Sequence, residues 1–137
     1  MADTRLDAQR ITLDPDPFDQ FNIALGYRVD GLVIVSGQAS IDEAGNIVGV
    51  GDFDAQAEQT FANLRRVLEA GGSGLDKIVK VTIYLTDMAN FPKIVELRAR
   101  YFTRPWPADT IVGVTALGLP ELQIEIEAIA LTDGEVR

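Results

Sequence analysis

Apolar residues recur along this chain with two spacings, one typical of strands and one of helices. Alternation at every second residue predicts a strand, and apolar residues three or four positions apart predict a helix. These patterns predict strands at about 23–29, 32–39, 77–85, 109–116 and 122–131, and helices at about 54–70 and 90–103. The short apolar pair at 47–48 leaves room for one more strand, so the order is ββ(β)αβαββ.

Turn and cap signals mark the ends of these elements. Asp30 and Gly31 form the dipeptide that type I′ hairpins prefer, because both central residues take positive φ. Asp52 or Asp54 caps the first helix, and the glycine pair at 71–72 ends it. A proline at position 92 fits the first turn of the second helix.

The predicted strands are apolar on both faces. In the strand at 122–131, Ile129 and Leu131 alternate out of phase with the apolar residues at 124, 126 and 128. In the strand at 77–85, Val79 is expected to share the core face with the apolar residues at 81, 83 and 85. Two amphipathic helices cover one sheet face, which predicts a two-layer α+β domain, and self-association would cover the other.

The chain is long enough for a single domain with a substantial core. It has 137 residues, of which 47% are hydrophobic, and no internal repeat or linker divides it. We expect a polar N-terminal extension at 1–19, the folded domain at 20–132 and a short tail at 133–137.

Composition excludes much chemistry. The chain contains neither histidine nor cysteine, which removes disulfides, structural zinc and the usual histidine base of a hydrolase. The net charge of −9 argues against nucleic acid and anionic membranes as partners. No apolar run approaches a membrane span and no signal peptide is evident, so we expect a cytoplasmic protein. Carboxylates, hydroxyls, lysines, arginines, backbone groups and bound water remain for catalysis.

Three segments in this order resemble a known family. They read VIVSGQAS at 33–40, VKVTIYLTDMANF at 79–91 and IEIEAIAL at 124–131, with the predicted helices between them. The chain resembles the RidA (YjgF) family of enamine/imine deaminases, also labelled L-PSP endoribonucleases, over about residues 20–132. The resemblance implies a chorismate-mutase-like fold and a homotrimer with clefts between subunits. It also implies hydrolysis of 2-iminobutanoate and 2-iminopropanoate without metal or cofactor.

The resemblance carries some site residues over. Glu125, the first glutamate of IEIE, matches the acid that positions water in the family. Ser36 and Gly37 match the segment that helps to position the substrate. We therefore expect Glu125 to act in catalysis and Ser36 and Gly37 to bind substrate.

Other positions depart from the family pattern. The family arginine in Pro-Ala-Arg, which holds the substrate carboxylate, is replaced here by Asp109. Ile111 stands where the family has a cysteine, and Val95 stands where it has an asparagine. Ile23 aligns near a tyrosine that lines the family's cleft. Because Asp109 reverses the charge of the clamp, we expect weak or absent 2-imino acid activity and a neutral or cationic substrate.

Several of these residues have a second interpretation. Asp109 either binds a substrate amine, shares a proton with Glu125, or caps a turn, which we favour slightly. Ser36 and Gly37 either face a ligand or form a plain bulge. Glu125 and Glu127 share one strand face, and each is either a carboxylate that activates water or a solvated or channel-lining acid at a trimer axis. Trp106 either lines the cleft, as a substrate-binding residue, or anchors an interface, which we favour.

Arg28 and Arg104 are the nearby candidates to replace the lost guanidinium, although each is more simply a solvated surface residue. Three functions stay open at this point. The first is a hydrolase or deaminase that acts on a small reactive metabolite. The second is a catalytically silent homotrimer that binds a small ligand in the same clefts. The third is a purely structural or partner-binding trimer.

Overall fold

The computed structural model describes residues 7–137. One sheet contains six strands, which are β1 (Ala8–Ile11), β2 (Gly26–Val29), β3 (Leu32–Gln38), β4 (Ile78–Leu85), β5 (Ala108–Gly113) and β6 (Ile124–Leu131). Two α-helices cross it, α1 (Phe53–Ala70) and α2 (Phe91–Tyr101). Short 3₁₀ turns are η1 (Asp19–Phe21), η2 (Leu75–Lys77) and η3 (Met88–Asn90).

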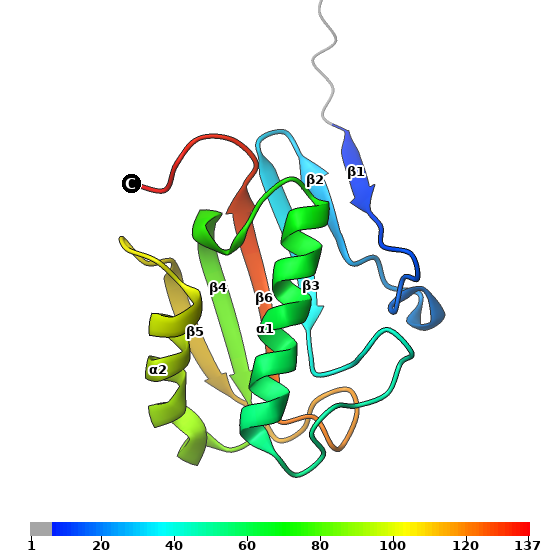
Figure 1. The fold of residues 1–137 in the computed structure, drawn as a ribbon, viewed down its shortest axis with the longest axis vertical. Coiled ribbons are helices and arrows are strands. Elements are labelled where there is room, and N and C mark those ends of the chain that lie inside the picture. Colours follow the sequence, from blue (N-terminus) through cyan, green and yellow to red (C-terminus); the bar gives the residue numbers. More distant parts are fainter. Residues whose placement is uncertain (1–6) are drawn as a thin grey trace, which may run out of the picture.

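The sheet is mixed. Its strand order is β1-β2-β3-β6-β4-β5, and among these described strands only the β4–β5 pair is parallel. The parallel pair is joined through α2, as a parallel connection requires. Both helices lie on the same side of the sheet (Figure 1). The predicted two-layer α+β architecture with two helices on one face is therefore confirmed.

Helix α1 supplies much of the core. The Asp52 side chain accepts a hydrogen bond from the backbone N–H of Ala55 at 3.1 Å and so caps the helix. The inward residues of α1 pack on the sheet, and fully buried apolar members of this core are Leu25, Val33, Ala57, Phe61, Leu64, Leu68, Val81, Ile83, Leu85, Ile94, Ile124, Ile126 and Ala130. The helical spacing seen in the sequence is the spacing of this buried face.

Strand β1 was not predicted. It pairs antiparallel with β2 at the sheet edge, and of its four residues only Ile11 is buried. A solvated edge strand has one buried position and thus no alternation for a sequence pattern to detect. Phe18 also belongs to the core, so the folded part begins before residue 20, and the expected polar extension at 1–19 is shorter than we assigned. Residues 1–6 of that extension lie outside the described residues.

Two local expectations are corrected. The β4–β6 ladder is irregular between Ile78 and Lys80, so Ile78 and not Val79 is buried in the core. The β2–β3 hairpin forms with its two-residue turn, but only Asp30 has positive φ, at 56°, whereas a type I′ turn needs it at Gly31 as well. The hairpin is confirmed and the turn type is wrong.

The sheet face opposite the helices is uncovered in the single chain. Tyr27, Leu32 and Ile34 are 40%, 39% and 46% exposed there, and the register places Ile129 beside Ile34. The prediction that strands carry apolar side chains on both faces is confirmed. Within residues 7–137, the helices are all too short or too polar to cross a bilayer.

Candidate functional site

A bulge in β3 prepares the site. The β3–β6 ladder shifts register between Val35 and Gln38, and the two residues between them are Ser36 and Gly37. A bulge bends its strand and re-aims side chains. The bulge that we considered as the plain alternative is present, and it lies beside the predicted catalytic acid.

Glu125 lies directly against the backbone of Gly37. A Cβ atom built at residue 37 would lie 2.1 Å from Glu125 Oε1 and 2.8 Å from its Cδ. Any side chain at this position would therefore displace the carboxyl group. Glycine is required here because it leaves room for Glu125, and its φ is not in the left-handed region.

Two further groups surround this acid on the open sheet face. Glu125 pairs in register with Tyr84 of β4, and Glu127 pairs with Thr82. The Tyr84 hydroxyl donates a short hydrogen bond to Glu127 Oε1. Strand alternation brings these side chains to one face, because the buried residues of both strands occupy the other.

The electrostatics of this group favour protonated forms. Burial, and secondarily the charge of Glu127, raises the pKa of Glu125 above its usual range. The hydrogen bond to Glu127, then burial and the nearby carboxylates, raises the pKa of Tyr84. A half-buried carboxyl with a raised pKa can take a proton from water and later return it. No group of three or more acidic side chains within residues 7–137 is arranged to hold a metal ion.

Glu125 opens into a hollow of about 480 Å³ on this face. Its lining residues are Phe18, Phe21, Ile23, Ser36, Gly37, Ala39, Ile41, Gly118, Leu119, Leu122, Glu125 and Glu127. An adjoining hollow of about 370 Å³ shares both acids and reaches Tyr84. The volumes of both hollows lie in the range of about 300–1,000 Å³ that is usual for small-molecule sites.

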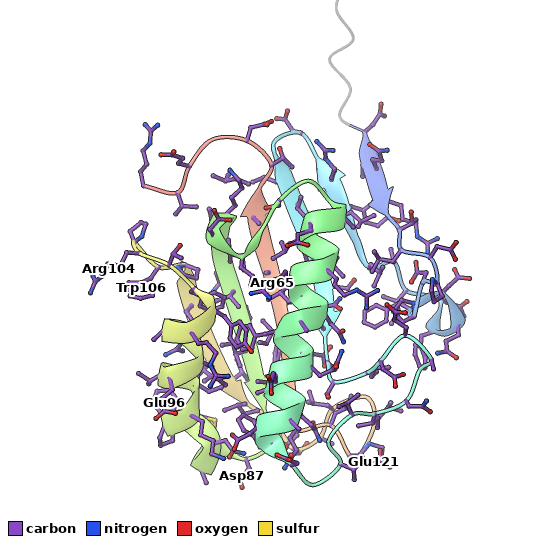
Figure 2. The ribbon with its side chains drawn as sticks, in the orientation of Figure 1. Arg65, Asp87, Glu96, Arg104, Trp106 and Glu121 are labelled. Atoms are coloured by element: carbon purple, nitrogen blue, oxygen red, sulfur yellow. The ribbon has the colours of Figure 1, made fainter. Side chains whose placement is uncertain are left out.

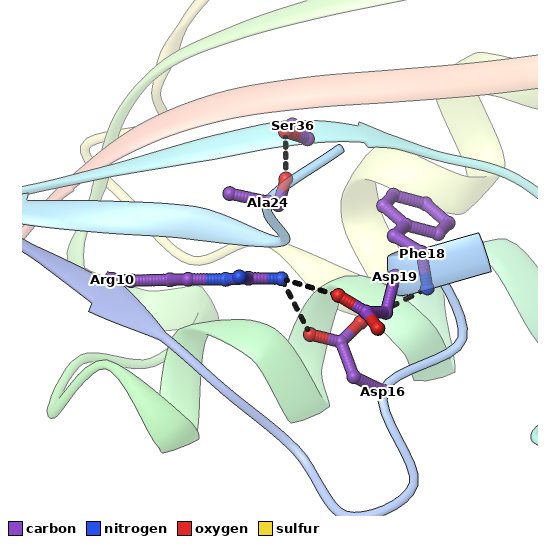
Figure 3. Close-up of polar contacts among 6 residues, drawn as sticks. All are labelled: Arg10, Asp16, Phe18, Asp19, Ala24 and Ser36. Atoms are coloured by element: carbon purple, nitrogen blue, oxygen red, sulfur yellow. Dashed lines mark hydrogen bonds and ion pairs between the residues drawn. The ribbon is translucent and has the colours of Figure 1, made fainter. Parts of the chain in front are cut away.

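Polar contacts hold the rim of the hollow in place (Figure 3). The Ser36 hydroxyl donates to the carbonyl oxygen of Ala24 at 2.6 Å. Arg10 of β1 binds Asp16 at 3.4 Å and Asp19 at 3.3 Å, which fixes the segment that carries Phe18. The unpredicted strand β1 therefore helps to build the site.

The loop on the other side of the hollow is tied to α1. The buried Gln56 side chain donates to the carbonyl oxygens of Gly49 at 3.1 Å and Glu121 at 2.9 Å. Its own oxygen accepts from the N–H of Gln123 at 2.8 Å. These bonds satisfy backbone groups just before β6 and so position the start of the strand that carries Glu125.

Asp109 and Ile111 lie on the other sheet face. Asp109 pairs in register with Val81 and Ile111 with Ile83, both core residues, so they face the helices. Asp109 accepts two hydrogen bonds from Arg98 of α2, at 2.8 Å from Nε and 2.9 Å from Nη2. A proton shared between Asp109 and Glu125, one of our expectations, is excluded within one chain.

Trp106 lies in a second, smaller hollow of about 200 Å³ that also contacts Arg98 and Asp109. It is 43% exposed, and the Arg104 guanidinium lies 5.3 Å from its ring centroid. Figure 2 shows both residues near the end of α2, beside the start of β5. Arg28 lies near Gly72 instead, so neither arginine that we considered lines the hollow of Glu125.

Ser36, Gly37 and Glu125, which we expected to act together, line the same hollow, whereas Arg98 and Tyr84 were not among the expected residues. A helix between parallel strands packs against both of them. That rule could have placed Arg98, near the end of α2, beside Asp109 at the start of β5. The alternation of β4 could likewise have placed Tyr84 on the face of Glu125.

The Arg98–Asp109 pair gives the first prediction. The Arg98 side chain is 28% exposed and the Asp109 side chain 15% exposed, so the pair is intermediate between a surface ion pair and a buried one. We expect a coupling free energy of about 1–2 kcal/mol, because the contact is bidentate but partly hydrated. A double-mutant cycle of Arg98→Ala and Asp109→Ala, measured by urea unfolding, tests this. A coupling indistinguishable from zero would contradict the pairing.

The fold and the site together define a class of protein. It is a two-layer α+β protein whose open sheet face carries an acidic, apolar-walled hollow. The profile of the endoribonuclease L-PSP family matches residues 12–132. A RutC family protein of Pyrococcus abyssi is 38% identical, over 85% of this chain and 89% of its own.

Two further similarities agree. A protein of Dermatophagoides farinae named 2-iminobutanoate/2-iminopropanoate deaminase is 31% identical, over 88% of this chain and 92% of its own. The crystal structure of YyfA, a Rid family protein of Yersinia pestis, superposes with a TM-score of 0.83 at 31% identity, covering 91% of this chain and 99% of that one. This chain belongs to the endoribonuclease L-PSP family, which is the RidA (YjgF) family.

Proposed function

We propose that this protein hydrolyses a small imine or enamine to a carbonyl compound and ammonia, with Glu125 as the acid-base group. One observation carries the proposal. A half-buried carboxyl group with a raised pKa is held against Gly37 in a hollow of small-molecule size. The deaminase name of the Dermatophagoides farinae relative supports the same chemistry.

The reaction needs one proton acceptor that later becomes a donor. Glu125 as carboxylate takes a proton from water while the water oxygen bonds to the iminium carbon, which gives a carbinolamine. Protonated Glu125 then gives the proton to the amine nitrogen. The C–N bond breaks, the hydroxyl proton passes to the departing ammonia as the carbonyl forms, and ammonium leaves while Glu125 is again a carboxylate. A raised pKa suits Glu125 to both steps.

The usual 2-imino acids are expected to be poor substrates. The family arginine would hold their carboxylate, but this position is Asp109, and its carboxylate already accepts both hydrogen bonds of Arg98. The pair is formally neutral and offers no free bidentate clamp from residue 109. Weak activity on 2-iminobutanoate and 2-iminopropanoate is therefore part of the proposal.

Association into a homotrimer is also proposed. The apolar residues Tyr27, Leu32 and Ile34 lie exposed on the open sheet face, where a partner copy would bury them. The family resemblance supports a trimer with clefts between subunits. The second hollow, with Trp106, would then be free to lie in such a cleft.

The test is an imine-trapping assay. An amino-acid oxidase generates 2-iminopropanoate from alanine, and a flavin-dependent amine oxidase generates uncharged or cationic imines from simple amines. Semicarbazide competes with water for each imine, so a hydrolase lowers semicarbazone formation. Acceleration with one or more imines supports the proposal. If all imines are unaffected but amines raise the Tm, the silent ligand-binding function replaces it.

The raised pKa predicts a pH dependence. Activity should fall as the pH is lowered through the pKa of Glu125, because the protonated acid cannot accept a proton from water. The midpoint should lie above the ordinary glutamate value of about 4.3. Glu127→Gln removes a nearby negative charge and should move the midpoint down. A kcat/KM profile of both proteins measures this, and an upward or absent shift would contradict the assignment.

A further inference from the structure

The hollow around Glu125 is apolar in its walls and acidic at its base. Phe21 and Ile23 form part of its rim and are 44% and 48% exposed. Leu119 and the buried Leu122 line the opposite side. The walls therefore offer nonpolar contact to a substituent much larger than the methyl or ethyl group of a three- or four-carbon imino acid.

The side-chain donors of the hollow are already used. The Ser36 hydroxyl donates to Ala24, and the Tyr84 hydroxyl donates to Glu127. The remaining side-chain groups that face the space are carboxylate oxygens, which accept hydrogen bonds. A ligand whose polar end donates hydrogen bonds therefore matches these side chains when Glu125 is the carboxylate that starts the reaction.

The charge of the hollow points the same way. Of the described residues, those that line its two parts include two glutamates and neither lysine nor arginine. Lys80 contacts a neighbouring hollow beside Glu127, where its ammonium group donates to Thr110 at 2.7 Å. A ligand carboxylate would meet two acids without a facing cation, whereas an iminium nitrogen would be stabilised by both.

We propose that the substrate is the iminium ion of an apolar amine, with its nitrogen beside Glu125 and Glu127 and its alkyl or aryl group against Phe21 and Ile23. This inference rests on the proposed imine hydrolysis and names its substrate class. The reaction is R–CH=NH₂⁺ plus water to R–CHO plus ammonium. The protein needs no oxidant for it, since an amine-oxidising reaction must supply the imine.

A matched pair of imines tests the inference. Phenethylamine with a flavin-dependent amine oxidase gives an imine without a carboxylate. Phenylalanine with an amino-acid oxidase gives the corresponding imine that carries one. For each imine, the rate of hydrolysis with the protein is divided by the rate without it in the same trapping assay. We expect kcat/KM to be at least about tenfold higher for the phenethylamine imine, because the transition state then lacks the repelled anion.

A charge placed in the rim sharpens the test. Ile23→Arg should lower the preference about tenfold or reverse it, since a guanidinium would then face the carboxylate. Ala70→Arg is the control, because Ala70 is exposed at the end of α1 and is not among the residues that line the hollow, so this change adds the same charge elsewhere. It should leave the preference unchanged.

The outcomes separate the two proposals. If both imines are hydrolysed and the phenylalanine imine is preferred, the substrate class is wrong while the hydrolase proposal stands, and a cation such as Arg98 of a second copy must reach the hollow. If neither imine is hydrolysed faster than in buffer, the inference fails, and the proposed function fails with it only when 2-iminopropanoate and the imines of simple amines are unaffected as well. An equal effect of Ile23→Arg and Ala70→Arg would also overturn the inference.

Discussion

Replacing Glu125 with glutamine is expected to lower kcat for imine hydrolysis about 100- to 10,000-fold, the usual contribution of a positioned acid-base group. Glutamine keeps the size of the side chain but cannot accept a proton from water. Steady-state kinetics with the best imine substrate measure the loss. KM should rise by much less than kcat falls, because Glu127 and the apolar walls still bind the substrate after the water-activating group is removed.

The stability of this variant separates a catalytic role from a structural one. The folded-state pKa of Glu125 is raised, so the folded protein binds more protons than the unfolded chain between the ordinary and the raised pKa. The free energy of unfolding therefore falls as the pH rises through that window. The neutral amide of the Glu125→Gln variant does not titrate, so the variant does not lose this stability. Its Tm at pH 7 should be equal to or higher than that of the original protein.

Glu96→Gln is the matched control for Glu125→Gln. Glu96 is exposed on α2, and Figure 2 shows it on the helix layer, away from the open sheet face. The same chemical change there should leave kcat unaltered. Full activity of Glu125→Gln would remove Glu125 from the mechanism, and an equal loss in both variants would indicate a nonspecific effect of charge.

Replacing Gly37 with alanine is expected to lower kcat about 100-fold or more while the fold remains intact. The added Cβ would lie 2.1 Å from Glu125 Oε1, far inside van der Waals contact. The nearest atoms belong to the end of a flexible side chain, so the carboxyl group can swing away at small cost in stability. The acid would then be present but misplaced, which costs rate through lost orientation.

Gly118→Ala is the control for Gly37→Ala. Gly118 lines the same hollow, but a Cβ there meets no atom within 4 Å. We expect near-normal kcat for it and unfolding free energies within about 1 kcal/mol of the original protein for both variants. If Gly37→Ala keeps full activity, the contact between residue 37 and the acid does not position Glu125 for catalysis.

The sequence predicted the main elements because their patterns are strong. Helix α1 was expected at about 54–70 and spans Phe53–Ala70, since its buried residues recur with helical spacing. Strand β6 was expected because its burial alternates over all eight residues, and β4 because its burial alternates from Val81 to Leu85. Glu125 was found through family resemblance, and the fold then placed it beside Ser36 and Gly37.

The errors have local physical causes. Strand β1 has one buried residue, so its backbone pairing leaves no hydrophobic pattern. The irregularity between Ile78 and Lys80 moves Val79 out of the core. One inserted residue turns each side chain that precedes it in the strand to the opposite face of the sheet. Asp109 was interpreted from its sequence position, whereas its partner Arg98 is brought to it by the packing of α2 on β5.

The sequence by itself determined the fold class, the family and the absence of histidine or cysteine chemistry, because periodicity, motif order and composition are properties of the chain. Only the tertiary structure decided which residues share a site. Glu125 faces the open hollow while Asp109 faces the helices, because strand alternation and register assign each side chain to one face of the sheet. Those assignments depend on hydrogen bonds between strands far apart in the chain, and no local pattern encodes them.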